Sequence, residues 1–212
     1  MTRLVRSALL AVLVALAPAI SHGEPVAGTW TKIDEEDGIH IWRLDIPGKD
    51  LPGFKGETVI PRSSAEIIDV LKQVEHHTTW MYRCSESSII QRVNDEHLVI
   101  YNRVDVPWPV KDRDVILDTA FHAESDRMVV LTFKNHDPKL RPLPDRVVRM
   151  PKLEGFYRLW QMSPTRTKVV YQVEADVGGA VPKWIAARVA KEMPYETLAA
   201  LRRRVIELHP KK

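Results

Sequence analysis

Residues 101–114 read YNRVDVPWPVKDRD and carry the most informative pattern of the chain. Residues 103–106 alternate charged and apolar side chains, as a half-buried β-strand does. Pro107-Trp108-Pro109 ends that strand, because proline has no backbone N–H to donate to a neighbouring strand. A further strand begins at Asp112-Arg113-Asp114. The stretch therefore predicts two strands joined by a proline-rich loop.

A second segment, GGAVPKW at residues 178–184, precedes the last predicted helix. Its two glycines end the β region, and Pro182 takes a first-turn position, where the missing N–H of proline is tolerated. An apolar stripe then follows at Ile185, Val189, Leu198, Leu201 and Val205. The pattern predicts one helix from Pro182 to about residue 208, with a kink at Pro194.

The rest of the chain is predicted to be mostly β. Residues 34–46 are predicted as a turn and a strand, and the further predicted strands are residues 54–60, 84–92, 97–106, 114–123, 128–134, 146–150, 156–162 and 167–175. Asp37-Gly38 predicts the turn before the first strand. Ser63 and Glu66 have the spacing of a capping box, so residues 64–76 are predicted as an amphipathic helix. Two strands, a helix, about seven antiparallel strands and a long helix make an α+β arrangement.

The two segments, in this order of strands and helices, resemble the START family, the steroidogenic-acute-regulatory-related lipid-transfer domains. The Pro-x-Pro…Arg-Asp pattern of the family matches residues 107–114, and its Gly-Gly-x-x-Pro-x-Trp pattern matches residues 178–184. Weaker matches are Asp37-Gly38-Ile39, Phe54-Lys55-Gly56-Glu57 and Trp80. The resemblance covers residues 30–208. One difference is that the usual leading helix is missing or is reduced to Glu24–Trp30.

The resemblance implies a helix-grip fold, in which a curved antiparallel sheet wraps around a long C-terminal helix and encloses a lipid-sized cavity. It also implies non-catalytic binding of one lipid or other hydrophobic small molecule, with no cofactor and no metal. An apolar cavity is sufficient for that task, because burying each CH₂ group contributes about 0.8 kcal/mol. The aromatic cage of phosphatidylcholine carriers and the charged pair of sterol-binding members are both absent, so the particular lipid stays open.

We expect the cavity between the last helix and the strands around residues 100–120, because each presents an apolar face. Positions four apart share one face of a helix, and alternate positions share one face of a strand. The predicted ligand-binding residues are Asn102, Val104, Val115, Leu117, Thr119, Trp184, Ile185, Val189 and Met193.

Two of the motif residues have structural alternatives. Arg113, which lies between two acids, can pin a loop to the sheet edge without touching a ligand, and we favour that interpretation. Trp184 either lies over the pocket or packs the start of the helix onto the sheet. Gly178-Gly179 and Pro194 give the last helix the features of a movable lid.

Two other functions remain compatible with the sequence. The first is an enzyme of the wider helix-grip superfamily, such as a polyketide aromatase/cyclase, which carries acid–base groups inside its cavity. The candidates here are Tyr101, Arg103, Asp105 and Tyr171, and no paired constellation stands out among them. The second is a non-catalytic module that binds a protein partner in an envelope complex.

The first 23 residues have the layout of a secretory signal peptide. Arg3 and Arg6 precede the apolar run SALLAVLVALAPA, and small residues follow up to Gly23. We therefore expect cleavage after Gly23, a mature domain of residues 24–212, and a periplasmic or secreted protein. The alternative is an uncleaved membrane anchor, which the short apolar run disfavours because a spanning helix needs about 20 apolar residues.

The net charge narrows the classes of molecule that we expect the protein to bind. Removing residues 1–23 takes away two arginines and no acid, which lowers the formal net charge from +3 to +1. A nearly neutral surface is not typical of nucleic-acid binding, so we expect no nucleic-acid partner. We expect instead a monomer that makes transient contact with membranes.

Reactive and metal-binding residues are few. Cys84 is the single cysteine and is predicted to be a small buried hydrophobe. His76 and His77 are adjacent, so on a helix they point about 100° apart and do not chelate one ion. We expect both to lie on the surface at a helix end.

Overall fold

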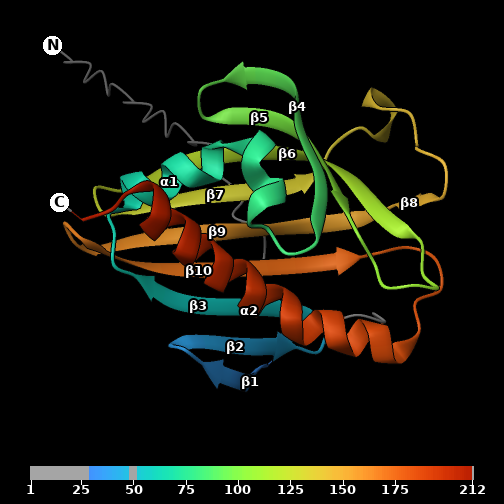
Figure 1. Ribbon diagram of the computed structural model, residues 1–212, viewed down its shortest axis with the longest axis horizontal. Helices are drawn as coiled ribbons and strands as arrows, with labels where there is room; N and C mark the ends of the chain where they lie inside the picture. The colour runs from blue at the N-terminus through green and yellow to red at the C-terminus, as the bar shows by residue number, and fades with distance from the viewer. Residues whose placement is uncertain (1–28, 48–51, 212) are drawn as a thin grey trace, which may run out of the picture.

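The computed structural model describes residues 29–47 and 52–211 (Figure 1). The predicted signal peptide at residues 1–23 lies outside this range. The strands are β1 (Trp30–Glu36), β2 (Ile39–Leu44), β3 (Gly53–Ile60), β4 (Cys84–Asn94), β5 (His97–Val104), β6 (Asp112–Ser125), β7 (Met128–Asn135), β8 (Val147–Arg149), β9 (Lys152–Ser163) and β10 (Arg166–Asp176). The helices are α1 (Ser64–Lys72), the 3-10 turns η1 (Val74–Thr79) and η2 (Pro138–Leu140), and α2 (Lys183–Leu208).

The ten strands form one curved, open sheet, and α2 lies across its concave face (Figure 1). The strand order is β1-β2-β3-β10-β9-β7-β6-β5-β4, and every pair along this path is antiparallel. The predicted α+β helix-grip fold is therefore confirmed. Strand β8 differs from the expectation, because it pairs parallel with β6 after the chain returns through the loop that follows β7.

The N-terminal edge of the sheet was incompletely predicted. Trp30–Glu36 forms a strand, β1, rather than the remnant of a leading helix. Asp37 and Gly38 then make a two-residue hairpin turn into β2, with φ angles of 51° and 70°. Positive φ at both central residues suits the right-handed twist of paired strands, and it explains why glycine stands second.

Helix α1 begins as the sequence predicts and ends earlier. Ser63 caps it, and the side chain of Glu66 accepts a hydrogen bond from the Ser63 backbone N–H at 2.7 Å. After Lys72 the chain tightens into the 3-10 turn η1 instead of continuing to residue 76. This change of pitch buries His77, which contradicts the predicted surface position, while His76 stays exposed. Burial lowers the pKa of His77 to about 4.

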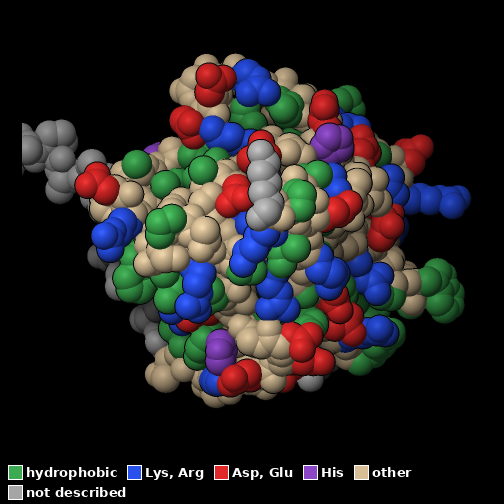
Figure 2. Space-filling view, turned by 60° about the vertical axis from the view of Figure 1, so that its left-hand side comes forward, with side chains coloured by type: hydrophobic (Ala, Val, Ile, Leu, Met, Phe, Trp, Pro, Cys, Tyr) green, Lys and Arg blue, Asp and Glu red, His purple; other side chains and the backbone are tan. Residues whose placement is uncertain are grey.

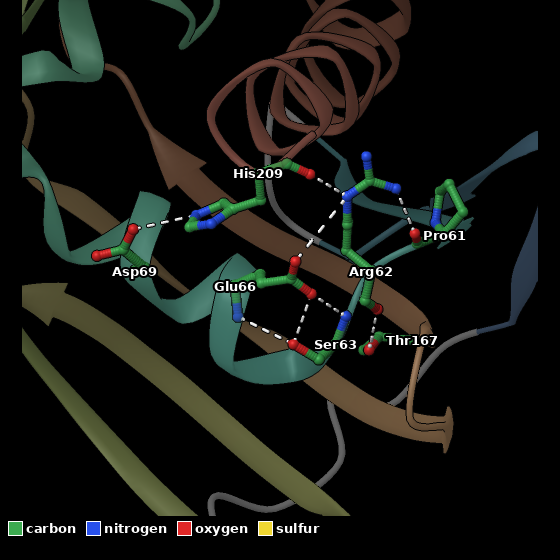
Figure 3. A network of polar contacts seen from close by, with 7 residues as sticks. All are labelled: Pro61, Arg62, Ser63, Glu66, Asp69, Thr167 and His209. Carbon is green, nitrogen blue, oxygen red and sulfur yellow. Dashed lines mark hydrogen bonds and ion pairs between the residues drawn. The ribbon is translucent and has the colours of Figure 1, made fainter. Parts of the chain in front are cut away.

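The C-terminal end of α2 is anchored to α1 and to the end of β3 (Figure 3). The guanidinium of Arg62, which is 6% exposed, donates from Nε to the carbonyl oxygen of His209 at 2.6 Å. Its Nη1 donates to the carbonyl of Pro61 at 2.7 Å, and the imidazole of His209 lies 3.1 Å from Asp69. Leu201 and Val205, just before this anchor, are fully buried in the core. The last turns of α2 are thus fixed in place.

The surface in Figure 2 carries acidic and basic side chains intermingled, without a continuous field of one sign. This pattern agrees with the nearly balanced totals of 31 Lys+Arg and 28 Asp+Glu. Within the described residues, no helix is long and apolar enough to span a membrane.

Candidate ligand-binding cavity

A cavity of about 200 Å³ lies between the N-terminal half of α2 and the concave face of the sheet. Strands β3, β5, β6, β9 and β10 form its floor, and α2 forms its roof. Its lining residues are Pro52, Phe54, Met81, Tyr82, Arg83, Asn102, Val104, Asp105, Val106, Arg113, Val115, Met150, Leu153, Tyr171, Val173, Ala175, Val177, Val181, Ile185, Val189, Met193 and Thr197. Most of them are apolar, so the space suits a hydrophobic molecule.

The packing of α2 explains why the cavity lies under the N-terminal half of this helix. At Gly56 in β3, a Cβ atom would lie 2.6 Å from Cδ1 of Leu198, so the helix approaches the sheet closely there only because this residue is glycine. Helix α1 fills the same end with Ile67, Val70 and Leu71. Towards its N-terminus α2 lacks this support, and the space beneath it stays open.

The structure brings together most of the residues predicted to bind ligand. Asn102, Val104, Val115, Ile185, Val189 and Met193 all line the cavity. Leu117 and Thr119 do not, although they follow Val115 on the same face of β6. They lie further along the strand within the closed core, where the hydroxyl of Thr119 donates to the carbonyl of Leu98 at 2.9 Å. Trp184 is also outside the lining, with 59% of its surface exposed.

From β10 the sequence analysis named only Tyr171, as a candidate acid–base group, and it missed the loop before β4. Tyr171, Val173 and Ala175 line the cavity from β10, and their alternation is a signal that the sequence does carry. Met81 and Arg83 come from an irregular loop, and no periodic pattern predicts where their side chains point.

The contacts of Arg113 confirm the prediction that this residue pins a loop to the edge of the sheet. The side chain is 4% exposed, and Nε and Nη2 donate to the carbonyls of Val177 and Gly178 at 3.2 Å and 2.9 Å. These bonds pin the segment before α2 to the edge of β6. Gly178 and Gly179 have φ angles of 63° and 65°, a left-handed conformation that favours glycine. Arg113 also lines the cavity, so it touches both the ligand space and the segment before α2.

Polar contacts join α2 to the loop before β4. The hydroxyl of Tyr82 donates to Oε2 of Glu192 in α2 at 2.7 Å, and Nε of Arg83 donates to the Tyr82 oxygen at 3.0 Å. Arg188, one turn earlier in α2, donates to the other oxygen of Glu192 at 2.7 Å. The hydrogen bond from Tyr82 and the neighbouring Arg188 lower the pKa of Glu192, so its carboxylate stays ionised at neutral pH.

Only two of the four groups considered for acid–base catalysis line the cavity. Tyr101 donates to Asp114 at 3.2 Å and Arg103 pairs with Asp112, so both side chains are engaged outside the lining. Burial raises the pKa of Tyr101 to about 12. Asp105 and Tyr171 do line the cavity, and burial raises the pKa of Tyr171 well above its usual value. A phenol with a raised pKa is a poor general base at neutral pH.

Cys84 and the histidines do not add a reactive centre. Cys84 is buried, and this burial raises the pKa of its thiol to about 11, which disfavours the nucleophilic thiolate. Among the described residues, no group of three or more His, Cys, Asp or Glu side chains is arranged to hold a metal ion.

Known proteins share this architecture. An uncharacterized protein of Pseudomonas aeruginosa is 29% identical over 180 residues, which cover 85% of this chain and 88% of that protein. The crystal structure of a STAR-related lipid transfer protein fragment from Xanthomonas axonopodis has a TM-score of 0.76 at 26% identity, covering 83% of this chain and 98% of that one. Human StAR-related lipid transfer protein 5 has a TM-score of 0.77 at 18% identity, covering 88% and 90% of the two chains.

An aromatase/cyclase of a Streptomyces species also shares the fold, with a TM-score of 0.52 at 11% identity over 74% of this chain and 96% of that one. A likeness at this identity concerns the fold alone. The START domain family model matches residues 28–211, which include every strand and helix described above and the whole lining of the cavity. The chain therefore belongs to the START domain family.

Proposed function

We propose that this protein binds one lipid or other hydrophobic small molecule and carries it through the aqueous part of the cell envelope, without catalysing a reaction on it. The observation that carries the proposal is the apolar cavity between α2 and the sheet. Burying an alkyl chain there is favourable by about 0.8 kcal/mol per CH₂ group, so binding needs no reactive group. The proposed setting in the envelope rests on the expected signal peptide at residues 1–23.

The size of the cavity implies that α2 moves when a lipid enters. Its volume of about 200 Å³ is below the roughly 300–1,000 Å³ of most ligand sites. The C-terminal end of α2 is anchored through Arg62 and buried side chains, whereas its N-terminal half lies over open space. The N-terminal half is therefore the part that we expect to lift, with Gly178 and Gly179 absorbing the rotation.

We further propose that the rim of the cavity touches the membrane during transfer. Trp108, in the loop between β5 and β6, is 89% exposed, and Trp184, at the start of α2, is 59% exposed. Val106 and Val181, which line the cavity, are two and three residues from these tryptophans in the sequence. Tryptophan favours the membrane–water interface because its ring is apolar and its N–H is polar. Both exposed indoles would enter the head-group region and lead the ligand out.

The test is extraction of protein purified from its own host, followed by mass spectrometry, and then transfer of the identified lipid between two vesicle populations. We expect one lipid per chain and transfer that increases with protein concentration. Turnover of a polyketide-like aromatic substrate would favour an enzyme instead. A stable co-purifying protein with no lipid would favour a partner-binding module, and either result would overturn the proposal.

A further inference from the structure

Three buried polar side chains in the cavity wall point to the chemistry of the ligand. Asn102, Arg113 and Tyr171 line the cavity and are 6%, 4% and 8% exposed. All three carry hydrogen-bond donors in a wall that is otherwise mostly apolar, and the hydroxyl of Tyr171 also shares a hydrogen bond with that of Tyr157. Buried donors are normally paired, so the partners of these groups determine what a ligand can add.

Among the described residues, the donors of Asn102 and Tyr171 both meet the thioether sulfur of a methionine. The side-chain oxygen of Asn102 accepts from Ser87 at 2.8 Å, whereas its nitrogen meets only Sδ of Met81 at 4.0 Å. The hydroxyl of Tyr171 likewise donates to Sδ of Met193 at 3.5 Å. Thioether sulfur is a weak acceptor, so both donors would gain from a ligand oxygen.

Arg113 has a buried positive charge with neutral partners. It donates to the backbone carbonyls of Lys111, Val177 and Gly178, and these bonds use three of the five N–H groups of a guanidinium. No carboxylate in the described part of the chain forms an ion pair with it, although the charge of the adjacent Asp112, which pairs with Arg103, acts on it. The adjacent Asp114 is bound by Arg149 at 2.6 Å instead. A buried charge is costly without a counter-ion, so an anion in the cavity would be favourable.

The strand register places Asn102 and Arg113 within reach of one small group. Asn102 pairs with Val115, and Val104 pairs with Arg113, so Asn102 and Arg113 are diagonal neighbours on the cavity side of β5 and β6. Diagonal residues of an antiparallel pair lie about 7–8 Å apart. The acidic lining residue, Asp105, is exposed to solvent, unlike these buried donors.

We propose that the ligand is an amphiphile with an anionic head group that only accepts hydrogen bonds, a carboxylate or a phosphate, bound by Asn102 and Arg113. This inference rests on the proposed function and specifies the ligand of the same cavity. The small volume favours a single alkyl chain, whose methylene groups lie against the apolar wall while Tyr171 bonds a second head-group oxygen. Arg113 thereby acts in two ways, as the counter-ion of the ligand and as the pin of the segment before α2.

The test compares four probes with the same sixteen-carbon chain: palmitate, hexadecyl phosphate, hexadecanol and methyl palmitate. We expect an anionic probe to bind at least about tenfold more tightly than the two neutral ones, since hydrogen bonds to charged groups are the stronger ones. The preferred anion identifies the head group. Equal or tighter binding of the neutral probes would overturn this inference and leave the proposed function intact. Binding of none of the probes would overturn the inference, and the host extraction described above decides the proposed function separately.

Variants locate the head group. Asn102→Asp keeps the shape and the bond from Ser87 but replaces a donor with an anion, so it should weaken palmitate binding at least about tenfold and leave hexadecanol binding nearly unchanged. Tyr171→Phe should weaken the anionic probe by a smaller factor. Thr132→Val, on an exposed position of β7, is the matched control and should change neither. An unchanged palmitate affinity in folded Asn102→Asp would overturn the assignment.

Discussion

The buried guanidinium of Arg62 holds the carbonyl oxygen of His209 at 2.6 Å, although the two residues are 147 positions apart in the sequence. The bond satisfies a carbonyl at the end of α2, where no further helical turn can provide a donor. It therefore joins the C-cap residue of the long helix to the connection between β3 and α1. One end of α2 is fixed by this contact, and the other end covers the cavity.

Replacing Arg62 with methionine should destabilise the protein. The change removes a charge-assisted bond to the carbonyl that ends α2, and we expect a loss of about 2 kcal/mol in the free energy of unfolding. Urea denaturation measures it. Arg203→Met, at an exposed position of the same helix, should change the value by less than about 0.5 kcal/mol. Equal effects of the two variants would show that the Arg62 contact does not stabilise the fold.

Hydrogen exchange should differ between the two halves of α2. In the lipid-free protein, residues 183–193 should exchange faster than residues 197–208, because the first half lies over the cavity and the second is packed and anchored. Adding the bound lipid should slow exchange in the first half. Tyr82→Phe, which removes the contact with Glu192, should speed it. Exchange that is uniform along α2, with and without lipid, would contradict the movement of the lid.

The Val189→Arg variant should lose lipid binding while it keeps its fold. Val189 lines the cavity and is half-buried, so an arginine there can reach solvent through the mouth while it fills the ligand space. We expect lipid binding to fall sharply with the fold intact, as measured by thermal melting and lipid titration. Val205→Arg is the matched control, because Val205 is fully buried in the core and its replacement should unfold the protein. Unfolding of the Val189 variant, or normal binding by it, would contradict the assignment.

The two exposed indoles at the rim should matter for membranes and not for stability. Trp108→Ala with Trp184→Ala should reduce vesicle binding and transfer rate several-fold, while lipid affinity in solution stays nearly unchanged. Trp160→Ala is the control, since Trp160 is 49% exposed on β9 and lies outside the cavity lining. Transfer that falls equally in the control would indicate a general surface effect rather than a docking rim.

His77 should make stability depend on pH. Its pKa is lowered from 6.5 to about 4 by burial, so between these values the unfolded chain binds more protons than the folded one. Stability should therefore fall as the pH decreases from about 6.5 to about 4, by a total of about 3 kcal/mol from this residue. Urea denaturation across this range should show a shallower slope for His77→Gln. His76→Gln, at the exposed neighbour, should keep the wild-type slope.

The sequence predicts features that depend on local periodicity and on turn chemistry. The capping box at Ser63 and Glu66 and the helical face of Ile185 and Val189 were predicted because each depends on spacing along one element. The buried position of His77 was not, because it follows from the change from α-helix to 3-10 turn after Lys72. A shift of pitch by one residue moves a side chain to another face, and composition carries little signal for it.

The periodicity of the sequence also could not predict how far the cavity extends along each strand. Alternation places Val115, Leu117 and Thr119 on one face, and all three do turn inwards. Only Val115 lines the cavity, because α1 and the anchored half of α2 close the core over the other two. Which part of an inward face stays open is decided by elements that are distant in sequence. Arg113 was half predicted for the same reason. That it pins a loop was expected, whereas the identity of that loop and the place of Arg113 in the cavity wall were not.

The open sheet has a consequence for how this architecture can diversify. The edge strands β1 and β4 stand at opposite ends of the strand order and do not pair with each other. A closed barrel has its radius set by strand number and stagger, whereas an open sheet has no such fixed radius. The distance between α2 and the sheet is instead set at a few contact points such as Gly56. A larger residue there would push the helix outwards and widen the cavity while leaving the strand pairing intact. A single substitution can therefore change the size of ligand that the cavity accepts.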